Sequence, residues 1–279
     1  MLPVHVVLVS LTRQTDPQDV SHVAAALQQQ VLRDVAPIWA VTATVDVFPR
    51  LRGIPAAYWP VAIVDDVKNA AGYHQDALGR PYALVEYSDS WSLTASHEVI
   101  EMLCDPLGRR VASGRSPKRD QGQVEFLIEA CDPCEAATFA YTINGVLVSD
   151  FITPHYYDPR TTTGARYSFT GSVTRPREIL RGGYVSWWEP QSNHVWQQTW
   201  FSGDGPAFRD LGSGGFSRAE LSLREFVDRE TEHPGLDHGL AESDETLADA
   251  RVAWQGANGS GDAVGARFEE EIERLLGAT

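Results

Sequence analysis

The most informative segment of the chain is Ser96-His97-Glu98-Val99-Ile100-Glu101-Met102-Leu103-Cys104-Asp105-Pro106. Its apolar residues recur at helical spacing and the Asp-Pro pair is a stop signal, so the pattern predicts a helix over residues 91–104. On a helix, His97 and Glu101 are four residues apart and project from the same face. Glu98 lies about 100° further round the helix. The helix therefore presents a His-Glu-x-x-Glu pattern.

An imidazole and a carboxylate on one helix face are suitable ligands for a divalent metal ion. In the related His-Glu-x-x-His pattern, the glutamate at the position of Glu98 polarises a metal-bound water. Here Glu101 replaces the second histidine. Because an anionic ligand donates more charge, zinc becomes a weaker Lewis acid, so Mn and Ca are alternatives to Zn. The competing interpretation is a charged surface on which His97 and Glu101 form a weak pair.

Upstream of this helix, the sequence predicts strands and one further helix. Short β-branched or alternating runs predict strands over residues 4–10, 43–48, 58–67 and 81–87. Apolar residues at helical spacing predict an amphipathic helix over residues 17–35. Residues 69–80 contain two glycines and are predicted to be turn-rich.

Downstream of the helix, the predicted structure is mostly β. Residues 107–122 are expected to form a surface loop. Residues 124–130 and 139–148 are expected to form a hairpin-like strand pair, and Asn144-Gly145 is a strong turn signal within the second. Residues 151–200 are rich in aromatic and turn residues, which predicts β-structure with long loops.

This order of elements, with the His-Glu-x-x-Glu pattern on the second helix, resembles the N-terminal half of the zincin metallopeptidases. The resemblance covers roughly residues 1–135 and implies an α+β fold in which a mixed sheet carries the active-site helix. It also implies that the segment from Tyr73 to Ser88 forms the edge strand that lines a substrate cleft. The implied activity is cleavage of a peptide bond by a metal-activated water, with Glu98 as general base.

The whole chain also resembles a group of bacterial and phage proteins in which His-Glu-x-x-Glu is followed by Asp-Pro. The matching pieces are residues 97–106, residues 129–133, Asn144-Gly145, Phe151 with Pro154, and Gly182-Gly183-Tyr184. This second resemblance implies no function.

A metal site needs a third ligand, and Glu129 is the preferred candidate. It lies 28 positions after Glu101, within the range over which zincins of the glutamate type find their third ligand, and it ends an apolar run. A solvent-facing strand residue is the alternative role for Glu129. Asp105 and Asp132 are alternative ligands, although each precedes a proline and suits a cap or a turn.

Two further segments carry weaker signals. His155, in an aromatic segment with Tyr156 and Tyr157, is a candidate for orienting a substrate oxyanion, and an aromatic loop cluster is the alternative. Cys131 and Cys134 form a Cys-x-x-Cys, but no helix is predicted to follow them as a redox motif requires. With Cys104 they supply three of the four ligands of a structural zinc site. We expect the cysteines to be inert.

Composition limits the classes of function. The 279 residues carry a formal net charge of −15, and because acidic surfaces repel phosphates we expect no nucleic-acid partner. No apolar run approaches the roughly 20 residues of a membrane span, so we expect no membrane partner. Three cysteines and no evident signal peptide favour a cytoplasmic location.

We expect three parts along the chain. Residues 1–150 form a zincin-like metal-binding domain, residues 151–229 form a β-rich aromatic extension packed on it, and residues 230–279 form an acidic tail. The tail holds 12 acidic and 3 basic residues and a short helix is predicted over residues 266–276. A solvated tail is the simpler interpretation, and docking to a protein partner is the alternative.

The leading hypothesis is a metal-dependent hydrolase that cleaves a peptide or protein substrate, with His97, Glu101 and Glu129 as metal ligands. One alternative is a catalytically inactive zincin-like structural or binding protein, such as a component or cargo of a phage-like particle. The other is a redox protein that uses Cys131 and Cys134.

Overall fold

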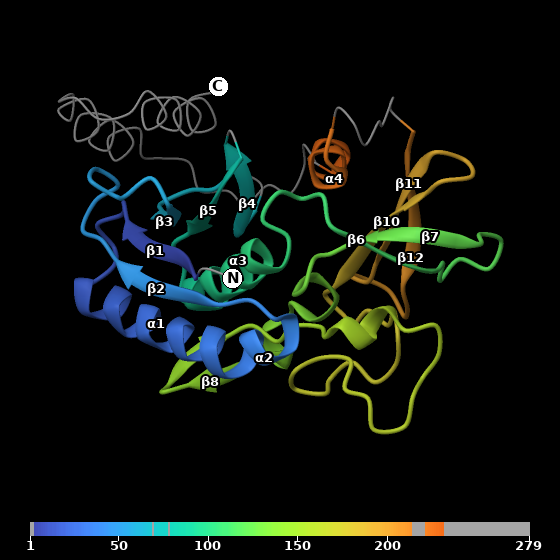
Figure 1. The fold of residues 1–279 in the computed structure, drawn as a ribbon, viewed down its shortest axis with the longest axis horizontal. Helices are drawn as coiled ribbons and strands as arrows, with labels where there is room; N and C mark the ends of the chain where they lie inside the picture. The colour runs from blue at the N-terminus through green and yellow to red at the C-terminus, as the bar shows by residue number, and fades with distance from the viewer. Residues whose placement is uncertain (1–2, 69, 78, 214–220, 232–279) are drawn as a thin grey trace.

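The computed structural model describes residues 3–68, 70–77, 79–213 and 221–231. They form an α+β fold with two five-stranded sheets and a separate two-stranded hairpin (Figure 1). Of the expected acidic tail, only residues 230–231 are described, so the tail and its predicted helix lie outside the described residues. Within the described ranges, no helix is long and apolar enough to cross a membrane.

The first sheet has the strand order β2-β1-β3-β5-β4. Its parallel strands are β1 (Val4–Ser10), β2 (Ala43–Val47), β3 (Tyr58–Val64) and β5 (Arg80–Glu86). The central strands are runs of buried residues, which is typical of a parallel sheet covered on both faces. All four were predicted from these runs.

The fifth strand, β4 (Gly72–Ala77), lies at the edge and pairs antiparallel with β5. It falls in the segment predicted to be turn-rich, so that prediction was wrong. The segment from Tyr73 to Ser88 is also not one edge strand. Its first part is the edge strand, where partly exposed residues predominate, and its second part is the inner strand β5, which is buried on both faces.

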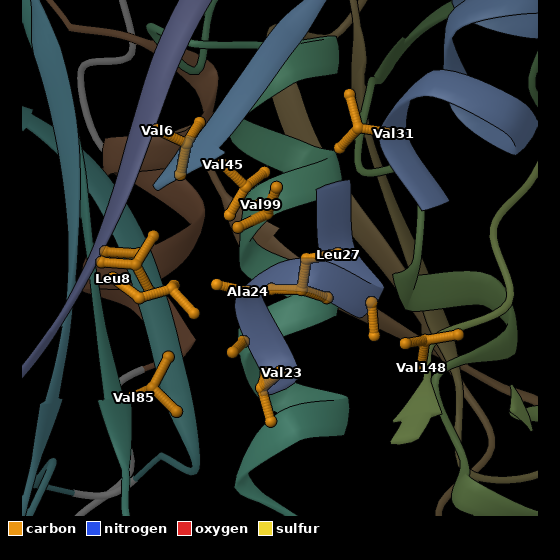
Figure 2. Packing of buried hydrophobic residues seen from close by; sticks show 14 of the residues in the cluster. Val6, Leu8, Val23, Ala24, Leu27, Val31, Val45, Val85, Val99 and Val148 are labelled. Atoms are coloured by element: carbon orange, nitrogen blue, oxygen red, sulfur yellow. The ribbon is translucent and has the colours of Figure 1, made fainter. Parts of the chain in front are cut away.

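Two helices cover one face of this sheet. Asp16 caps α1 (Pro17–Gln30) by accepting a hydrogen bond from the Gln18 N–H at 2.7 Å. The helix continues through a π-helical turn (Val31–Val35) into α2 (Ala36–Trp39). The second helix is α3 (Trp91–Cys104), whose bounds match the prediction. Figure 2 shows the core between helices and sheet, with Val6, Leu8 and Val85 from the strands, Val23, Ala24 and Leu27 from α1, and Val99 from α3.

The second sheet is antiparallel and has the order β12-β11-β10-β7-β6. Its strands are β6 (Val111–Arg115), β7 (Gln123–Leu127), β10 (Tyr184–Glu189), β11 (His194–Thr199) and β12 (Ala207–Gly212). It takes strands from both sides of residue 150. The prediction of a loop over residues 107–122 missed β6, whose sequence Val-Ala-Ser-Gly-Arg has no apolar alternation.

The predicted pairing of residues 124–130 with residues 139–148 was wrong. The Asn144-Gly145 turn instead closes a local hairpin of β8 (Tyr141–Ile143) and β9 (Val146–Val148), which packs on α1 and α3. β7 pairs with β6 and β10, and β10 lies far away in the sequence.

The last described helix, α4 (Leu223–Thr231), connects the two sheets. In Figure 1 it lies between the edge strand β4 and the second sheet. Its apolar side chains pack against Leu127, Val195 and Leu211 of the second sheet. As a result, α3, β4, α4 and the segment that follows β7 all meet at one place.

Candidate metal centre

The helix α3 presents the predicted residue pair on one face. The Nε2 atom of His97 lies 3.2 Å from Oε2 of Glu101. The side chain of Glu101 is buried, and that of His97 is 14% exposed. The helix therefore offers an imidazole nitrogen and a carboxylate oxygen to the same point in space, as the four-residue spacing predicts.

The segment after β7 brings two more carboxylates to this point. Glu101 Oε1 accepts a hydrogen bond from the Cys131 N–H at 2.9 Å, which fixes this segment to the helix. Next to Cys131, Asp132 places Oδ1 3.3 Å from His97 Nε2. Ligand atoms of Glu101, Glu129 and Asp132 lie within 4.8 Å of one another. The structure thus brings together all three predicted ligands and one of the two alternatives.

The surroundings of these carboxylates distinguish them as ligands. Asp132 is buried, and its Oδ1 faces the imidazole of His97. Glu129 is paired with the guanidinium of Arg224. The other alternative, Asp105, accepts hydrogen bonds from the N–H groups of Arg109 and Arg110 at 3.0 and 2.9 Å. Asp105 therefore caps the turn that follows α3, while the carboxylate of Asp132 faces His97.

Glu135 and Tyr184 lie near these ligands and are the first of four residues that were not singled out by the sequence. Ligand atoms of His97, Asp132 and Glu135 lie within 4.8 Å of one another. Burial, followed by the charge of Asp132, raises the pKa of Glu135 to about 8. Burial and the charges of Asp132 and Glu135 also raise the pKa of Tyr184 well above its usual value. Glu135 could have been found from the sequence, because it lies only three residues after Asp132. Tyr184 could not, because it is distant from the other site residues in the chain.

The general-base candidate Glu98 faces the edge strand. Its Oε2 lies 2.9 Å from Nδ1 of His74, a buried residue of β4, and this nitrogen is 3.7 Å from Glu101 Oε2. The strand β4 can lie this close to α3 because Gly72 has no side chain. A Cβ at this position would lie 2.6 Å from Thr94 Cγ2 and 3.0 Å from Glu98 Oε1. His74 was passed over in the sequence because no spacing relates it to α3.

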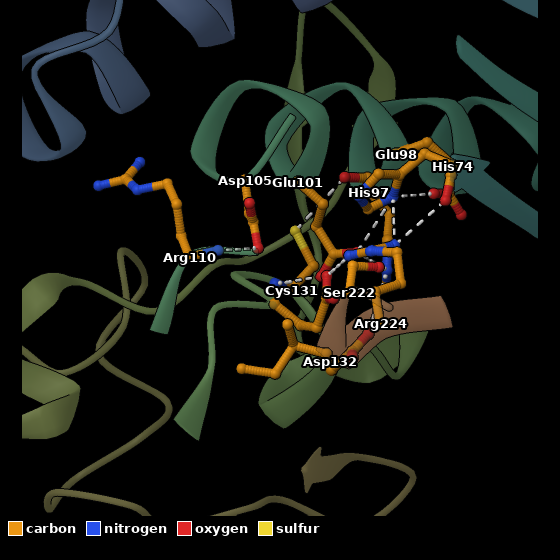
Figure 3. Close-up of polar contacts among 12 residues, drawn as sticks. His74, His97, Glu98, Glu101, Asp105, Arg110, Cys131, Asp132, Ser222 and Arg224 are labelled. Atoms are coloured by element: carbon orange, nitrogen blue, oxygen red, sulfur yellow. Dashed lines mark hydrogen bonds and ion pairs between the residues drawn. The ribbon is translucent and has the colours of Figure 1, made fainter. Parts of the chain in front are cut away.

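The other missed residue is Arg224, which enters the cluster from α4 (Figure 3). It is 8% exposed, and its Nη1 lies 3.0 Å from His74 Nδ1. Nothing in the sequence around Arg224 indicates this position, because the contact depends on how α4 docks.

The cluster holds more acid than base. Five carboxyl groups share it with one guanidinium and two imidazoles, namely Glu98, Glu101, Glu129, Asp132 and Glu135 with Arg224, His74 and His97. Burial raises the pKa of Glu98 to about 8, and burial with the charge of Glu101 raises the pKa of Asp132 to about 6. Although burial opposes it, the charge of Glu101 and hydrogen bonding to Asp132 raise the pKa of His97. Without a metal, the cluster therefore retains protons that a divalent cation would replace.

The remaining candidates lie in other surroundings. The side chain of His155 is 60% exposed, and its Nδ1 lies 2.9 Å from Asp158. Among the contacts of the described residues, none joins His155 to the cluster, so the structure does not bring it together with Glu98. Cys104, Cys131 and Cys134 are buried free thiols, and burial raises the pKa of each well above its usual value. A raised pKa disfavours the reactive thiolate, which is consistent with inert cysteines.

Comparison with known proteins gives no relative: no protein-family model matches the chain, and neither a curated protein nor a solved structure is detectably similar to it. The function therefore has to be inferred from the side chains of the cluster.

Proposed function

We propose that the protein is a metal-dependent hydrolase in which His97, Glu101 and Asp132 hold one divalent cation. The observation that supports the proposal best is the buried carboxylate of Asp132, whose Oδ1 faces His97 Nε2 at 3.3 Å beside the carboxylates of Glu101 and Glu129. Burying several carboxyl groups side by side is costly, because each ionised group disfavours the ionisation of its neighbours. A cation held between these atoms would remove that cost and offset the excess of carboxylates.

The ligand set favours Zn and leaves Mn and Ca as alternatives. One imidazole with two carboxylates suits zinc in a site that keeps an open position. Carboxylate-rich sites also suit Mn and Ca, which prefer oxygen ligands. Glu129 is a further oxygen donor within 4.8 Å of Glu101 and Asp132. Its pairing with Arg224 places it second to Asp132 as a ligand.

The proposed chemistry assigns each side chain one role. The cation would supply a polarised water, and Glu98 would take the proton from that water. Glu98 follows His97 directly on α3 and is buried against His74, so a substrate would meet its carboxyl group away from bulk solvent. In the metal-free chain, burial raises the pKa of Glu98 to about 8, so it holds a proton near neutral pH. A bound cation would lower that pKa and leave the ionised carboxylate that can take a proton.

A peptide is the proposed substrate because of the edge strand. β4 ends the first sheet and contacts the candidate site through His74. An edge strand can pair its backbone with an extended peptide. An edge strand beside the metal-binding helix is also what the resemblance to the zincins implies, and the proposal extends that resemblance to the activity.

Peptide cleavage tests the proposal. The full chain, loaded in turn with Zn, Mn or Ca, is incubated with a peptide library, and the products are identified by mass spectrometry. We expect cleavage by the wild type, and loss of cleavage with retention of metal in Glu98→Gln. Glu125→Gln is the matched control, because Glu125 lies on β7 and bonds Ser113. No cleavage with any ion, or equal cleavage by Glu98→Gln, would contradict the proposal.

One observation favours a second candidate, an inactive structural or binding protein with the same fold. The guanidinium of Arg224 already pairs with Glu129 and contacts His74. The positive charge of Arg224 offsets part of the negative charge of the carboxylates, so the cluster attracts a metal ion less strongly. In this alternative, the chain binds no metal and Glu98→Gln has no effect on any activity.

A further inference from the structure

The side chain of Arg224 borders the candidate metal site and reaches it from α4. Its Nη1 donates to His74 Nδ1 at 3.0 Å and to the His74 carbonyl oxygen at 3.3 Å. Its Nη2 pairs with Glu129 Oε2. Figure 3 shows the side chain of Arg224 reaching from its helix into the group of side chains that includes His74. The guanidinium thus contacts a carboxylate and an imidazole that are both within reach of a bound ion.

The guanidinium is incompletely satisfied in this position. Its Nη2 is taken up by the ion pair with Glu129, while its Nε is buried and makes no hydrogen bond. A guanidinium has five N–H donors, and leaving buried donors unpaired is costly. Arg224 is therefore held by its ion pair with Glu129 and its hydrogen bonds to His74, and one buried donor stays unpaired. A cation of higher charge in the same cluster would compete with it directly.

The helix that carries Arg224 is held by other contacts. Leu223, Phe226 and Val227 pack in the apolar cluster with the second sheet. The Arg224 N–H also donates to the Gly108 carbonyl oxygen at 3.3 Å. Because these contacts do not involve the guanidinium, the side chain can leave the cluster while α4 stays docked.

A second acidic residue lies near Arg224 on the same helix. Asp228 lies one turn further along α4, and its charge is among the causes that raise the pKa of Arg224. Side chains four residues apart on a helix are neighbours. A guanidinium that leaves Glu129 can therefore turn towards Asp228 and keep an opposite charge.

We propose that Arg224 is an internal cation that competes with the metal for the carboxylate cluster, so that metal loading displaces its guanidinium from Glu129 and His74. The inference rests on the proposed metal site and adds a residue that regulates how readily the site takes up metal. Displacement has a consequence for Glu98. While His74 Nδ1 accepts a hydrogen bond from Arg224, this nitrogen cannot also donate to Glu98. Once Arg224 has left, the tautomer with its proton on Nδ1 can orient Glu98 by donating to it.

Metal affinity in matched arginine variants tests the proposal. Zn, Mn and Ca binding by the full chain is measured by isothermal titration calorimetry, after circular dichroism has confirmed that each variant is folded. We expect Arg224→Gln to bind metal about tenfold more tightly or better, because the ion no longer displaces a buried charge. Arg224→Lys keeps the charge and should stay near the wild-type affinity.

The control is Arg229→Gln, which makes the same change on the same helix. The side chain of Arg229 is 51% exposed and pairs with Glu230, away from the cluster. The metal affinity of Arg229→Gln should equal that of the wild type. If the wild type binds metal but Arg224→Gln binds it equally or more weakly, the competition is refuted and the proposed metal site stands. If neither the wild type nor Arg224→Gln binds any of the three ions, both proposals fail.

Discussion

At the scale of single residues, the ionisation of Glu98 makes the free energy of unfolding depend on pH. Burial raises the pKa of its carboxyl group to about 8, against about 4.5 in an exposed glutamate. Between these two values, the metal-free folded chain holds a proton that the unfolded chain releases. Its stability therefore falls as the pH rises from about 4.5 towards 8. We expect Glu98→Gln, which cannot ionise, to become more stable relative to the wild type over this range.

Urea unfolding of both metal-free proteins at pH 5 and pH 8 measures this difference. Part of the pH dependence should persist in the variant, because Glu135 also has a pKa raised to about 8. Equal losses of stability in wild type and Glu98→Gln would show that Glu98 is not held protonated in the fold.

The sequence predicted those residues of the site that follow local rules. The spacing of His97 and Glu101 determines that they share a helix face, and Asp132 was recognised as an alternative ligand next to the preferred Glu129. His74 and Arg224 could not be predicted, since they reach the site from β4 and α4. Their positions depend on the pairing of β4 with β5 and on the docking of α4, and neither leaves a pattern of spacing in the chain.

At the scale of elements, the short helical turn Asp132–Cys134 must keep a fixed position relative to α3, so that Asp132 faces His97. Gly183 presses against this turn, and a Cβ on it would lie 2.6 Å from the Asp132 carbonyl oxygen and 2.7 Å from that of Pro133. We expect Gly183→Ala to destabilise the chain by about 1–3 kcal/mol and to weaken metal binding by shifting Asp132.

Thermal unfolding and metal titration measure the two effects. Gly205→Ala is the matched control, because a Cβ there would have no atom within 4 Å. If Gly183→Ala matched Gly205→Ala in both measurements, the turn would not be what positions Asp132.

Elements that bury a regular apolar run were predictable, and elements defined by distant partners were not. The runs of β1, β3 and β5 identify them as inner strands. β4 lacks such a run because it lies at the sheet edge. The turn signal at Asn144-Gly145 was correct, but it closes its own hairpin and says nothing about the partners of β7.

At the scale of the whole molecule, the cluster joins parts of the chain that are far apart in sequence. A cation that binds there stabilises the folded state and has no preformed site in the unfolded chain. At a free-ion concentration 100 times the Kd, the gain is about 2.7 kcal/mol. For a chain of this size, we expect a rise in Tm of about 5–10 °C. Differential scanning calorimetry with Zn, Mn and Ca, each reversed by a chelator, measures this rise. A Tm unaffected by all three ions would contradict it.

Metal content is the most direct test of the proposed site. We would measure it by elemental mass spectrometry on the wild type, His97→Ala and His194→Ala, each purified without chelator or histidine tag and reconstituted with Zn, Mn and Ca. His194 is the matched control, because its imidazole pairs with Asp210 on β12. The proposal predicts about one equivalent of metal in the wild type and His194→Ala, and none in His97→Ala. No metal in the wild type, or equal metal in His97→Ala, would contradict the assignment of a metal centre to α3.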